Sequence, residues 1–286
     1  MYPVLFRIGH FPVSTYGLLL AVAVFVALSL FARALRNAGE DPDEAWSVGT
    51  WVLLGGIVGA KLYYVLLHQD PAALFSRAGL VWYGGLIGGA AAAALAIRWK
   101  ELPFLPTLDA LAPAAAVGHA IGHIGCFFSG DSYGLPSTLP WAVAFPRGMP
   151  PSTAGNLRTE FGVDIPAGIP DSALLTVHPT MLYSTLVLGA VAALLWWILR
   201  RGPRPGLVFG LYLVLAGLER FFMEFLRAKD DRFLAGFTTA QAIALLLIVG
   251  GSILLATRPR RAEERGRPRG LATSPSGSSV TGTGGA

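Results

Sequence analysis

The chain has 286 residues, of which 53% are hydrophobic and only 14% are charged, with a net charge of +5 at pH 7. About a quarter of the residues of a soluble domain are charged, so this composition excludes an ordinary soluble protein and predicts a surface that faces lipid. The positive charge alone would also suit a nucleic-acid-binding protein. Its distribution along the chain argues against one, and we expect no nucleic-acid partner.

Apolar runs long enough to cross a hydrocarbon layer of about 30 Å recur along the chain and predict an all-α, polytopic membrane protein with about seven transmembrane helices. In chain order, these runs are Ser14 to Leu35, Ala45 to Leu67, Val81 to Trp99, Leu108 to Phe128, His178 to Leu199, Leu207 to Phe225 and Phe237 to Ala256. The first run lacks a small-residue cleavage site, so we interpret it as a retained span and not a signal peptide. Residues 1–257 are expected to form one membrane domain.

Seven spans place the two termini on opposite sides of the membrane. The short loop after the fifth span contains Arg200, Arg201 and Arg204, which predicts that this loop is cytoplasmic, because positive charge is retained inside. We therefore expect a bacterial inner-membrane protein with a periplasmic N-terminus and a cytoplasmic C-terminus. Residues 258–286 are basic and then rich in Gly, Ser and Thr, and are expected to form a disordered cytoplasmic tail near anionic headgroups.

One connection is much longer than the others. Residues 129–177 are rich in Pro, Gly and polar groups, and loops of this length without a role are uncommon. We expect a small folded cap on the periplasmic face. The single cysteine, Cys126, cannot form an internal disulfide, so packing and hydrogen bonds must hold this cap together.

Ionisable side chains at membrane depth are costly, so each is a candidate functional residue. The fourth predicted span contains Asp109, His119 and His123, and the two histidines are four residues apart on one helical face. They lack the adjacent glutamate of the zinc-protease helix motif, so hydrogen-bonded polar groups are favoured over a metal site, and we expect no metal. Lys61, in the second span, can extend toward the membrane surface or pair with Asp109.

The sixth predicted span contains a second ionisable group. Arg220, Glu224 and Arg227 share one stripe of this helix because offsets of four and seven residues return to the same side, and Glu219 directly precedes Arg220. The stripe can be a structural ion pair or an anion-binding site.

Several segments at these positions carry the ordered motifs of one family. VWYGGLIGG, GHAIGHIGCFFSGDSYG, LPWAVAFP, VHPTMLYS and GLERFFMEFLR follow one another in that order, after STYGLLLA and GAKLYYVL. From about Pro12 to Arg227 the chain resembles the prolipoprotein diacylglyceryl transferases. The order of motifs across six spans is far more specific than any one of them.

The resemblance implies an enzyme that transfers the diacylglyceryl group of phosphatidylglycerol to the lipobox cysteine thiol of a prolipoprotein signal peptide and releases glycerol 1-phosphate. Such a displacement needs cations for the phosphate, a group that favours the thiolate, and shelter for two acyl chains in contact with membrane lipids. It requires no cofactor. The Gly-rich runs lie within apolar spans and do not predict a nucleotide site.

The resemblance and the ionisable residues at membrane depth together give three groups of expected site residues. The catalytic group is expected to comprise Tyr83, His123, Arg220 and Glu224. The phospholipid-binding group is expected to comprise His123, Arg220, Arg227, Lys61, Tyr16 and Gly134. The supporting group is expected to comprise Asp109, His119, Cys126, His178 and Tyr183.

Three positions depart from the family pattern. Tyr83 stands where the family usually has His, His123 where it has Arg, and Ser184 where it has Glu. A neutral histidine holds phosphate less firmly than arginine, and tyrosine is a poor base at neutral pH. One compensating arrangement is that His123 or His119 accepts the proton while Lys61 and Arg220 hold phosphate. The alternative functions are an altered or silent paralogue that binds phospholipid or lipoprotein signal segments, and a transporter with a buried proton relay.

Overall fold

A computed structural model of the chain describes residues 3–69, 71, 74, 81–229, 232–234 and 237–257. These residues contain seven long helices, each of which matches one predicted apolar run: α1 (Thr15–Ala38), α2 (Asp43–His68), α3 (Trp82–Trp99), α4 (Phe104–Ser129), α6 (Thr180–Leu199), α7 (Leu207–Met223) and α8 (Thr239–Thr257). The largest difference at a helix start is in α4, which begins about one turn before the predicted Leu108. The predicted all-α, polytopic architecture is confirmed. The predicted tail, residues 258–286, lies outside the described residues.

Five of these helices are long and apolar enough to cross a membrane: α1, α2, α4, α6 and α8. The other two, α3 and α7, are not among them, and α7 has only 17 residues. Within the part of the chain that the structure describes, seven long helices are therefore present, and five qualify as spans by length and composition. The number of seven spans stays a prediction.

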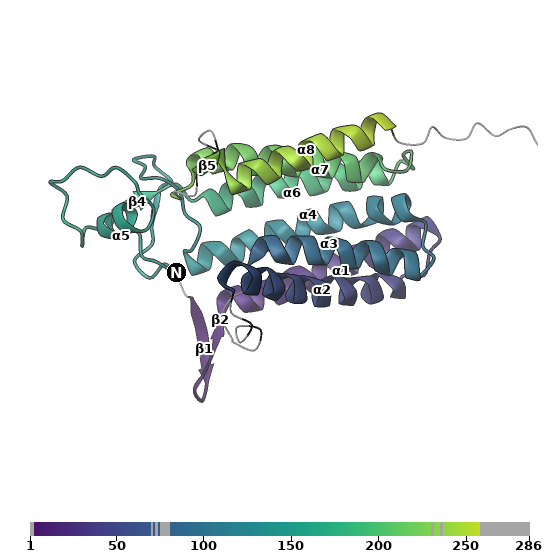
Figure 1. Cartoon of the computed structure of the whole chain (residues 1–286), viewed down its shortest axis with the longest axis horizontal. Coiled ribbons are helices and arrows are strands. Elements are labelled where there is room, and N and C mark those ends of the chain that lie inside the picture. The colour runs from purple at the N-terminus through teal and green to yellow at the C-terminus, as the bar shows by residue number, and fades with distance from the viewer. Residues whose placement is uncertain are drawn as a thin grey trace, which may run out of the picture.

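The seven helices run side by side along the long axis of the molecule (Figure 1). Helices α1 to α4 form one half of the bundle and α6 to α8 the other, and α4 packs against both α6 and α7. The segment between α4 and α6, residues 130–179, lies at one end, which we call the cap end. The start of the chain also lies there, whereas α8 finishes at the opposite end (Figure 1).

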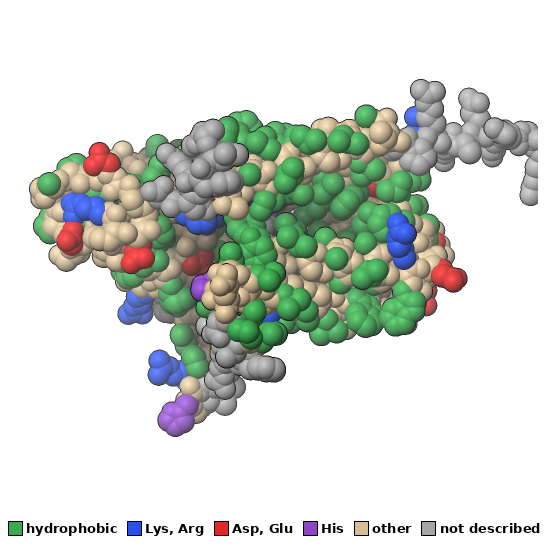
Figure 2. Space-filling view, viewed as in Figure 1, with side chains coloured by type: hydrophobic (Ala, Val, Ile, Leu, Met, Phe, Trp, Pro, Cys, Tyr) green, Lys and Arg blue, Asp and Glu red, His purple; other side chains and the backbone are tan. Residues whose placement is uncertain are grey.

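The outer surface of the bundle is apolar. Large side chains such as Phe25, Leu66, Leu186 and Leu246 are between 62% and 75% exposed. Figure 2 shows hydrophobic side chains spread over the helices, with charged ones at the two ends and on the cap. Exposure of this extent is costly in water but not in lipid, which agrees with a membrane environment.

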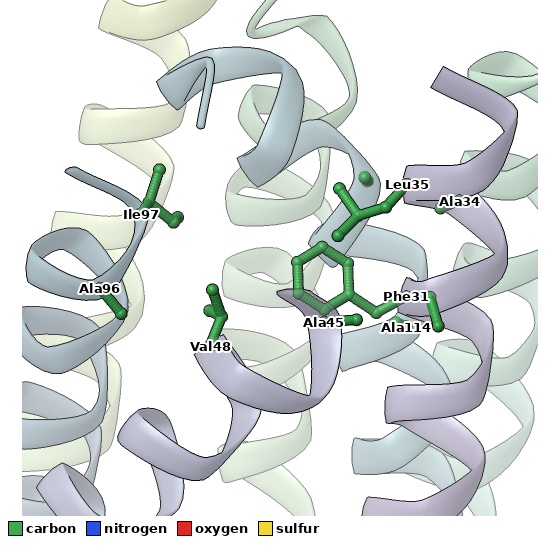
Figure 3. Packing of buried hydrophobic residues seen from close by; sticks show 10 residues of the cluster. Phe31, Ala34, Leu35, Ala45, Val48, Ala96, Ile97 and Ala114 are labelled. Carbon is green, nitrogen blue, oxygen red and sulfur yellow. The ribbon is translucent and has the colours of Figure 1, made fainter. Parts of the chain in front are cut away.

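The best-packed part of the bundle lies away from the cap end. Phe31 and Leu35 of α1 are buried there beside Val48 of α2, Ile97 of α3 and Ala114 of α4 (Figure 3). Because this cluster joins the first four helices at one end, it fixes the scaffold and leaves the cap end of α4 free to present polar groups.

Helices α2 and α3 approach each other through glycines. A Cβ at Gly59 would lie 2.3 Å from the carbonyl oxygen of Gly84, and a Cβ at Gly88 would lie 2.3 Å from that of Gly55. No side chain larger than hydrogen fits at such a contact, which is typical of membrane helices held together by small residues. The glycines near Lys61 thus let α2 and α3 pack closely.

The cap segment has its own small hydrophobic cluster, which includes Tyr133, Phe145, Leu157 and Val177. The Tyr133 hydroxyl donates to the carbonyl oxygens of Pro150 and Pro151, and burial raises the pKa of Tyr133 to about 12, so this phenol stays neutral. Short elements that hydropathy did not predict are two-stranded sheets and short helices: β1 (Val4–Ile8) with β2 (Phe11–Ser14), β3 (Val143–Ala144) with β4 (Thr176–Val177), β5 (Arg232–Leu234) with β6 (Phe237–Thr238), α5 (Ala154–Thr159) and the 3-10 turn η2 (Glu224–Leu226).

Asp109 lies at the end opposite the cap, where α7 begins. Its carboxylate accepts hydrogen bonds from the backbone N–H groups of Gly206 (2.7 Å) and Phe209 (2.8 Å). The first turn of a helix has unpaired N–H groups, and Gly206, at the N-cap position, has no side chain to satisfy them. Asp109 of α4 therefore caps α7 from a neighbouring helix.

Replacing Asp109 with alanine is expected to destabilise the protein by about 2 kcal/mol, because two buried N–H groups lose a charged acceptor. Asp109→Asn keeps one acceptor oxygen and should lose less. Thermal unfolding in detergent measures both. A melting temperature unchanged in Asp109→Ala would contradict the capping role.

Candidate phosphate-binding site at the cap end

A small cavity lies between α4, α6 and α7 at the cap end. Its walls combine two arginines, a histidine and three hydroxyl side chains with two methionines: His123, Ser132, Thr180, Met181, Ser184, Arg220, Met223 and Arg227. The cavity measures about 10 Å³, roughly the space of one water molecule. A larger polar ligand requires wall side chains to move, and the arginine and methionine side chains are the flexible ones.

Two arginines at this cavity converge on one carboxylate. Arg220 of α7 forms an ion pair with Glu224, the first residue of η2, and Arg227 Nε lies 4.0 Å from the same carboxylate oxygen. The Glu224 side chain is only 1% exposed, and those of Arg220 and Arg227 are 25% and 20% exposed. Two guanidinium groups share this one buried carboxylate oxygen, so both arginines keep N–H donors that an anionic ligand can use.

Unpartnered polar atoms gather in the same region. Among the described residues, six buried side-chain atoms lack a hydrogen-bond partner, and the five around this cavity are His123 Nδ1, Asp131 Oδ1, Glu219 Oε2, Glu224 Oε1 and Arg227 Nε. Buried polar atoms are nearly always paired, so such a concentration is typical of a site that binds a polar ligand.

Helix α4 contributes its last turns to this site. His119 and His123 stack with ring centroids 4.8 Å apart, so the predicted shared face is confirmed. One turn further on, the Cys126 thiol faces Asp131 and Ser132 of the cap segment. Within the described part of the chain, no three His, Cys, Asp or Glu side chains are grouped so as to hold a metal ion.

Tyr16 lies beside the same stretch of α4. Its ring edge would be 3.1 Å from a Cβ at Gly125, so the first turn of α1 packs directly on α4 there. The Tyr16 side chain is 38% exposed. This position, next to Cys126, keeps Tyr16 near the site without placing it in the cavity wall.

Gly134 has a packing role in this structure. Its N–H donates to the His178 carbonyl, and the residue bridges to Arg227 as in a short antiparallel pair. A Cβ at this position would lie 2.4 Å from the carbonyl oxygen of Leu226. Gly134 thus lets the cap segment pass close beside Arg227, and its predicted lipid contact remains a prediction.

His178, whose carbonyl accepts the Gly134 N–H, lies beside Tyr183. His178 Nδ1 is 3.3 Å from the Tyr183 hydroxyl, which also accepts a hydrogen bond from Trp141 of the cap at 2.7 Å. His178 lines an open groove of about 680 Å³ in the cap, together with apolar residues such as Leu139 and Ile165. These two residues therefore connect the cap to α6, and their supporting role stays a prediction.

Three further predicted site residues, Lys61, Tyr83 and Asp109, do not line the cavity. Lys61 of α2 and Tyr83 of α3 belong to a helix pair that contributes nothing to the cavity wall. Asp109 is 14 residues before His123 on α4, which corresponds to about 21 Å along the helix. The expectation that Tyr83 meets His123 and Arg220 in one pocket has no support in this geometry, and its catalytic role stays a prediction.

The sequence prediction did not include several residues of the wall. Thr180 and Ser184 of α6 and Ser132 of the cap line the cavity, and Glu219 of α7 accepts a hydrogen bond from Ser184. The four-residue spacing of the two α6 hydroxyls was the available signal, because it places them on one helical face. For Asp131, the available signal was an ionisable side chain three residues after the end of the fourth predicted span.

The fold and the site together define an integral membrane protein with two arginines and a histidine around one cavity at one end of a helical bundle. A sequence profile of the prolipoprotein diacylglyceryl transferases matches residues 3–257. Relatives called phosphatidylglycerol–prolipoprotein diacylglyceryl transferase include proteins of Thermosynechococcus vestitus, 31% identical with 86% of this chain and 88% of the relative covered, and of Clostridium tetani, 30% identical with 88% and 95% covered.

A third relative of that name, from Geobacter sulfurreducens, is 31% identical over 273 residues, which are 91% of this chain and 96% of the relative. The chain belongs to the prolipoprotein diacylglyceryl transferase family. It is therefore a transferase, as its motifs predicted.

Proposed function

We propose that this protein transfers the diacylglyceryl group of phosphatidylglycerol to the lipobox cysteine thiol of prolipoproteins and releases glycerol 1-phosphate. The observation that carries the proposal is the set of Arg220, Arg227 and His123 around one cavity at the cap end. Phosphatidylglycerol and prolipoprotein are the substrates in the names of the relatives.

The two arginines have the properties that the leaving group needs. A guanidinium presents planar pairs of N–H donors that match phosphate oxygens, and its charge is permanent. Arg220 and Arg227 both approach the same carboxylate oxygen of Glu224, so they already converge on a negatively charged group. A phosphate placed against them gains the most stabilisation when the bond to the glycerol carbon breaks and negative charge develops on its oxygen.

The proposed step balances as a direct displacement. The thiol sulfur forms a bond to the glycerol CH₂ carbon that carries the phosphate, and the carbon–oxygen bond to the phosphate breaks. The oxygen and its electron pair leave with glycerol 1-phosphate, and the thiol proton passes to a base. His123, with Nδ1 unpartnered and buried in the cavity wall, is the base that we propose.

We also propose that the cap end is periplasmic. The N-terminus and the cap lie at this end and α8 finishes at the other (Figure 1), and Arg200, Arg201 and Arg204 follow α6 at that other end. A periplasmic cap end in the bacterial inner membrane gives the site access to the outer leaflet and to exported prolipoproteins.

A reconstituted transfer reaction tests this function. The purified protein is incubated with phosphatidylglycerol and a lipobox peptide, and both the mass gain of the peptide and released glycerol 1-phosphate are measured. We expect both products to appear together. We also expect the protein to restore growth of cells depleted of their own transferase. Lipid binding without either product would refute the proposal and indicate a silent paralogue.

A further inference from the structure

Helix α6 presents two hydroxyl groups to the cavity. Thr180 and Ser184 are one turn apart, both line the cavity, and they are only 2% and 3% exposed. Neither residue is required by the chemistry proposed above, which uses the arginines and the histidine.

Both hydroxyls have already committed their only proton. Ser184 Oγ donates to a carboxylate oxygen of Glu219, and Thr180 Oγ1 donates to the carbonyl oxygen of Ser132 at 2.7 Å. A hydroxyl has one donor and two acceptor lone pairs, so what remains for a ligand in the cavity is acceptor capacity. Glu219, itself buried at 7% exposure, is the positioning residue that fixes Ser184 in this state.

The two walls of the cavity are therefore chemically opposite. Arg220 and Arg227 of the α7 side can only donate hydrogen bonds, whereas Thr180 and Ser184 of α6 can only accept them. A ligand that satisfies both walls has an anionic group next to hydrogen-bond donors. A phosphodiester that bears a polyol fits this description, because its phosphate can meet the arginines while its hydroxyls donate to Thr180 and Ser184.

We propose that Thr180 and Ser184, with Ser184 oriented by Glu219, recognise the hydroxyl groups of the glycerol headgroup and make the site selective for a polyol phospholipid. This inference rests on the proposed function, which places a phosphatidylglycerol headgroup in the cavity. In the proposed reaction, the peptide thiol could also donate a hydrogen bond to Thr180 and Ser184. The test therefore separates recognition of the headgroup hydroxyls from recognition of the thiol.

The test compares two lipids with the same acyl chains and charge: phosphatidylglycerol, and phosphatidylpropanol, whose propyl headgroup has no hydroxyls. We expect the unmodified protein to transfer from phosphatidylglycerol at least about tenfold faster, and Ser184→Ala to reduce this ratio to about two. A loss of rate in Ser184→Ala that is equal for both lipids would overturn the proposal and assign Ser184 to the thiol. Equal rates of the unmodified protein on both lipids would also overturn it.

Thr185→Val is the matched control. Thr185 neighbours Ser184 on α6, but its hydroxyl donates to the carbonyl oxygens of Ala120 and Met181 and does not line the cavity. We expect Thr185→Val to keep the ratio of the two transfer rates, phosphatidylglycerol over phosphatidylpropanol, of the unmodified protein. A ratio reduced as much as in Ser184→Ala would contradict the assignment of headgroup recognition to Thr180 and Ser184. Glu219→Met provides a second variant if Ser184→Ala fails to fold, since it keeps the approximate size of the side chain, removes the acceptor of the Ser184 proton and should also reduce the ratio.

A binding measurement keeps this inference separate from the proposed function. If the protein transfers from neither lipid, the function fails, and the affinities of the two lipids in detergent then test the inference alone. We expect about tenfold tighter binding of phosphatidylglycerol, reduced to about twofold in Ser184→Ala. Equal affinities for the unmodified protein would overturn it.

Discussion

Replacing Arg220 with alanine is expected to reduce diacylglyceryl transfer by about a thousandfold, the effect typical of removing a donor aimed at developing negative charge. Arg220 lines the cavity and pairs with the buried Glu224. Arg220→Lys keeps the charge but loses the planar fork, so we expect a reduction of about a hundredfold. Initial rates with phosphatidylglycerol and a lipobox peptide measure both.

Loss of activity must be separated from loss of folding, because Arg220→Ala leaves Glu224 with only the more distant Arg227. Removing one partner of a buried pair costs about 3 to 5 kcal/mol, whereas replacing both by apolar residues is often neutral. The double variant Arg220→Met with Glu224→Met should therefore recover stability but not activity. Arg204→Ala, in the loop at the opposite end, is expected to leave the rate unchanged. Full activity in a stable double variant would contradict the role of Arg220.

The sequence predicted the helices well because membrane spans depend on a one-dimensional property, a run of apolar residues of sufficient length. The run from Leu207 to Phe225 became α7, Leu207–Met223, with the same first residue. The start of α4 was missed by four residues because Phe104 to Thr107 follow a loop proline and are less uniformly apolar. The cap contains short strands that pair across more than thirty residues, such as Val143 with Val177, and hydropathy does not indicate such pairs.

The site was predicted where it depends on spacing along one helix and was missed where it depends on contact between helices. Helical periodicity predicted that Arg220, Glu224 and Arg227 lie together, and they do, although α7 ends at Met223, Glu224 begins η2 and Arg227 is extended. The bond from Ser184 to Glu219 joins residues 35 apart, and only the packing of α6 on α7 reveals it. Asp109 was expected near the site because it is ionisable, but its position along α4 places it beneath the start of α7.

Changing His123 to arginine is expected to abolish transfer, with a reduction of at least about a hundredfold, because a permanently charged guanidinium cannot accept the thiol proton. His123 lines the cavity with Nδ1 unpartnered, and Arg220 and Arg227 already supply two fixed positive charges there. His123→Gln keeps a polar side chain of similar size without a base and should lose activity to the same extent. Rates at saturating lipid separate this effect from weaker lipid binding.

The opposite result has a clear physical meaning. If His123 is instead a weakened phosphate clamp, Arg at this position adds a bidentate donor, so His123→Arg would raise turnover and lower the lipid concentration needed for half-maximal rate. His119→Gln is the matched comparison, since His119 stacks on His123 but does not line the cavity. We expect it to retain most of the activity, because His123 alone presents a nitrogen to the reacting groups. A loss in His119→Gln as large as that in His123→Gln would transfer the proton-accepting role to the stacked pair.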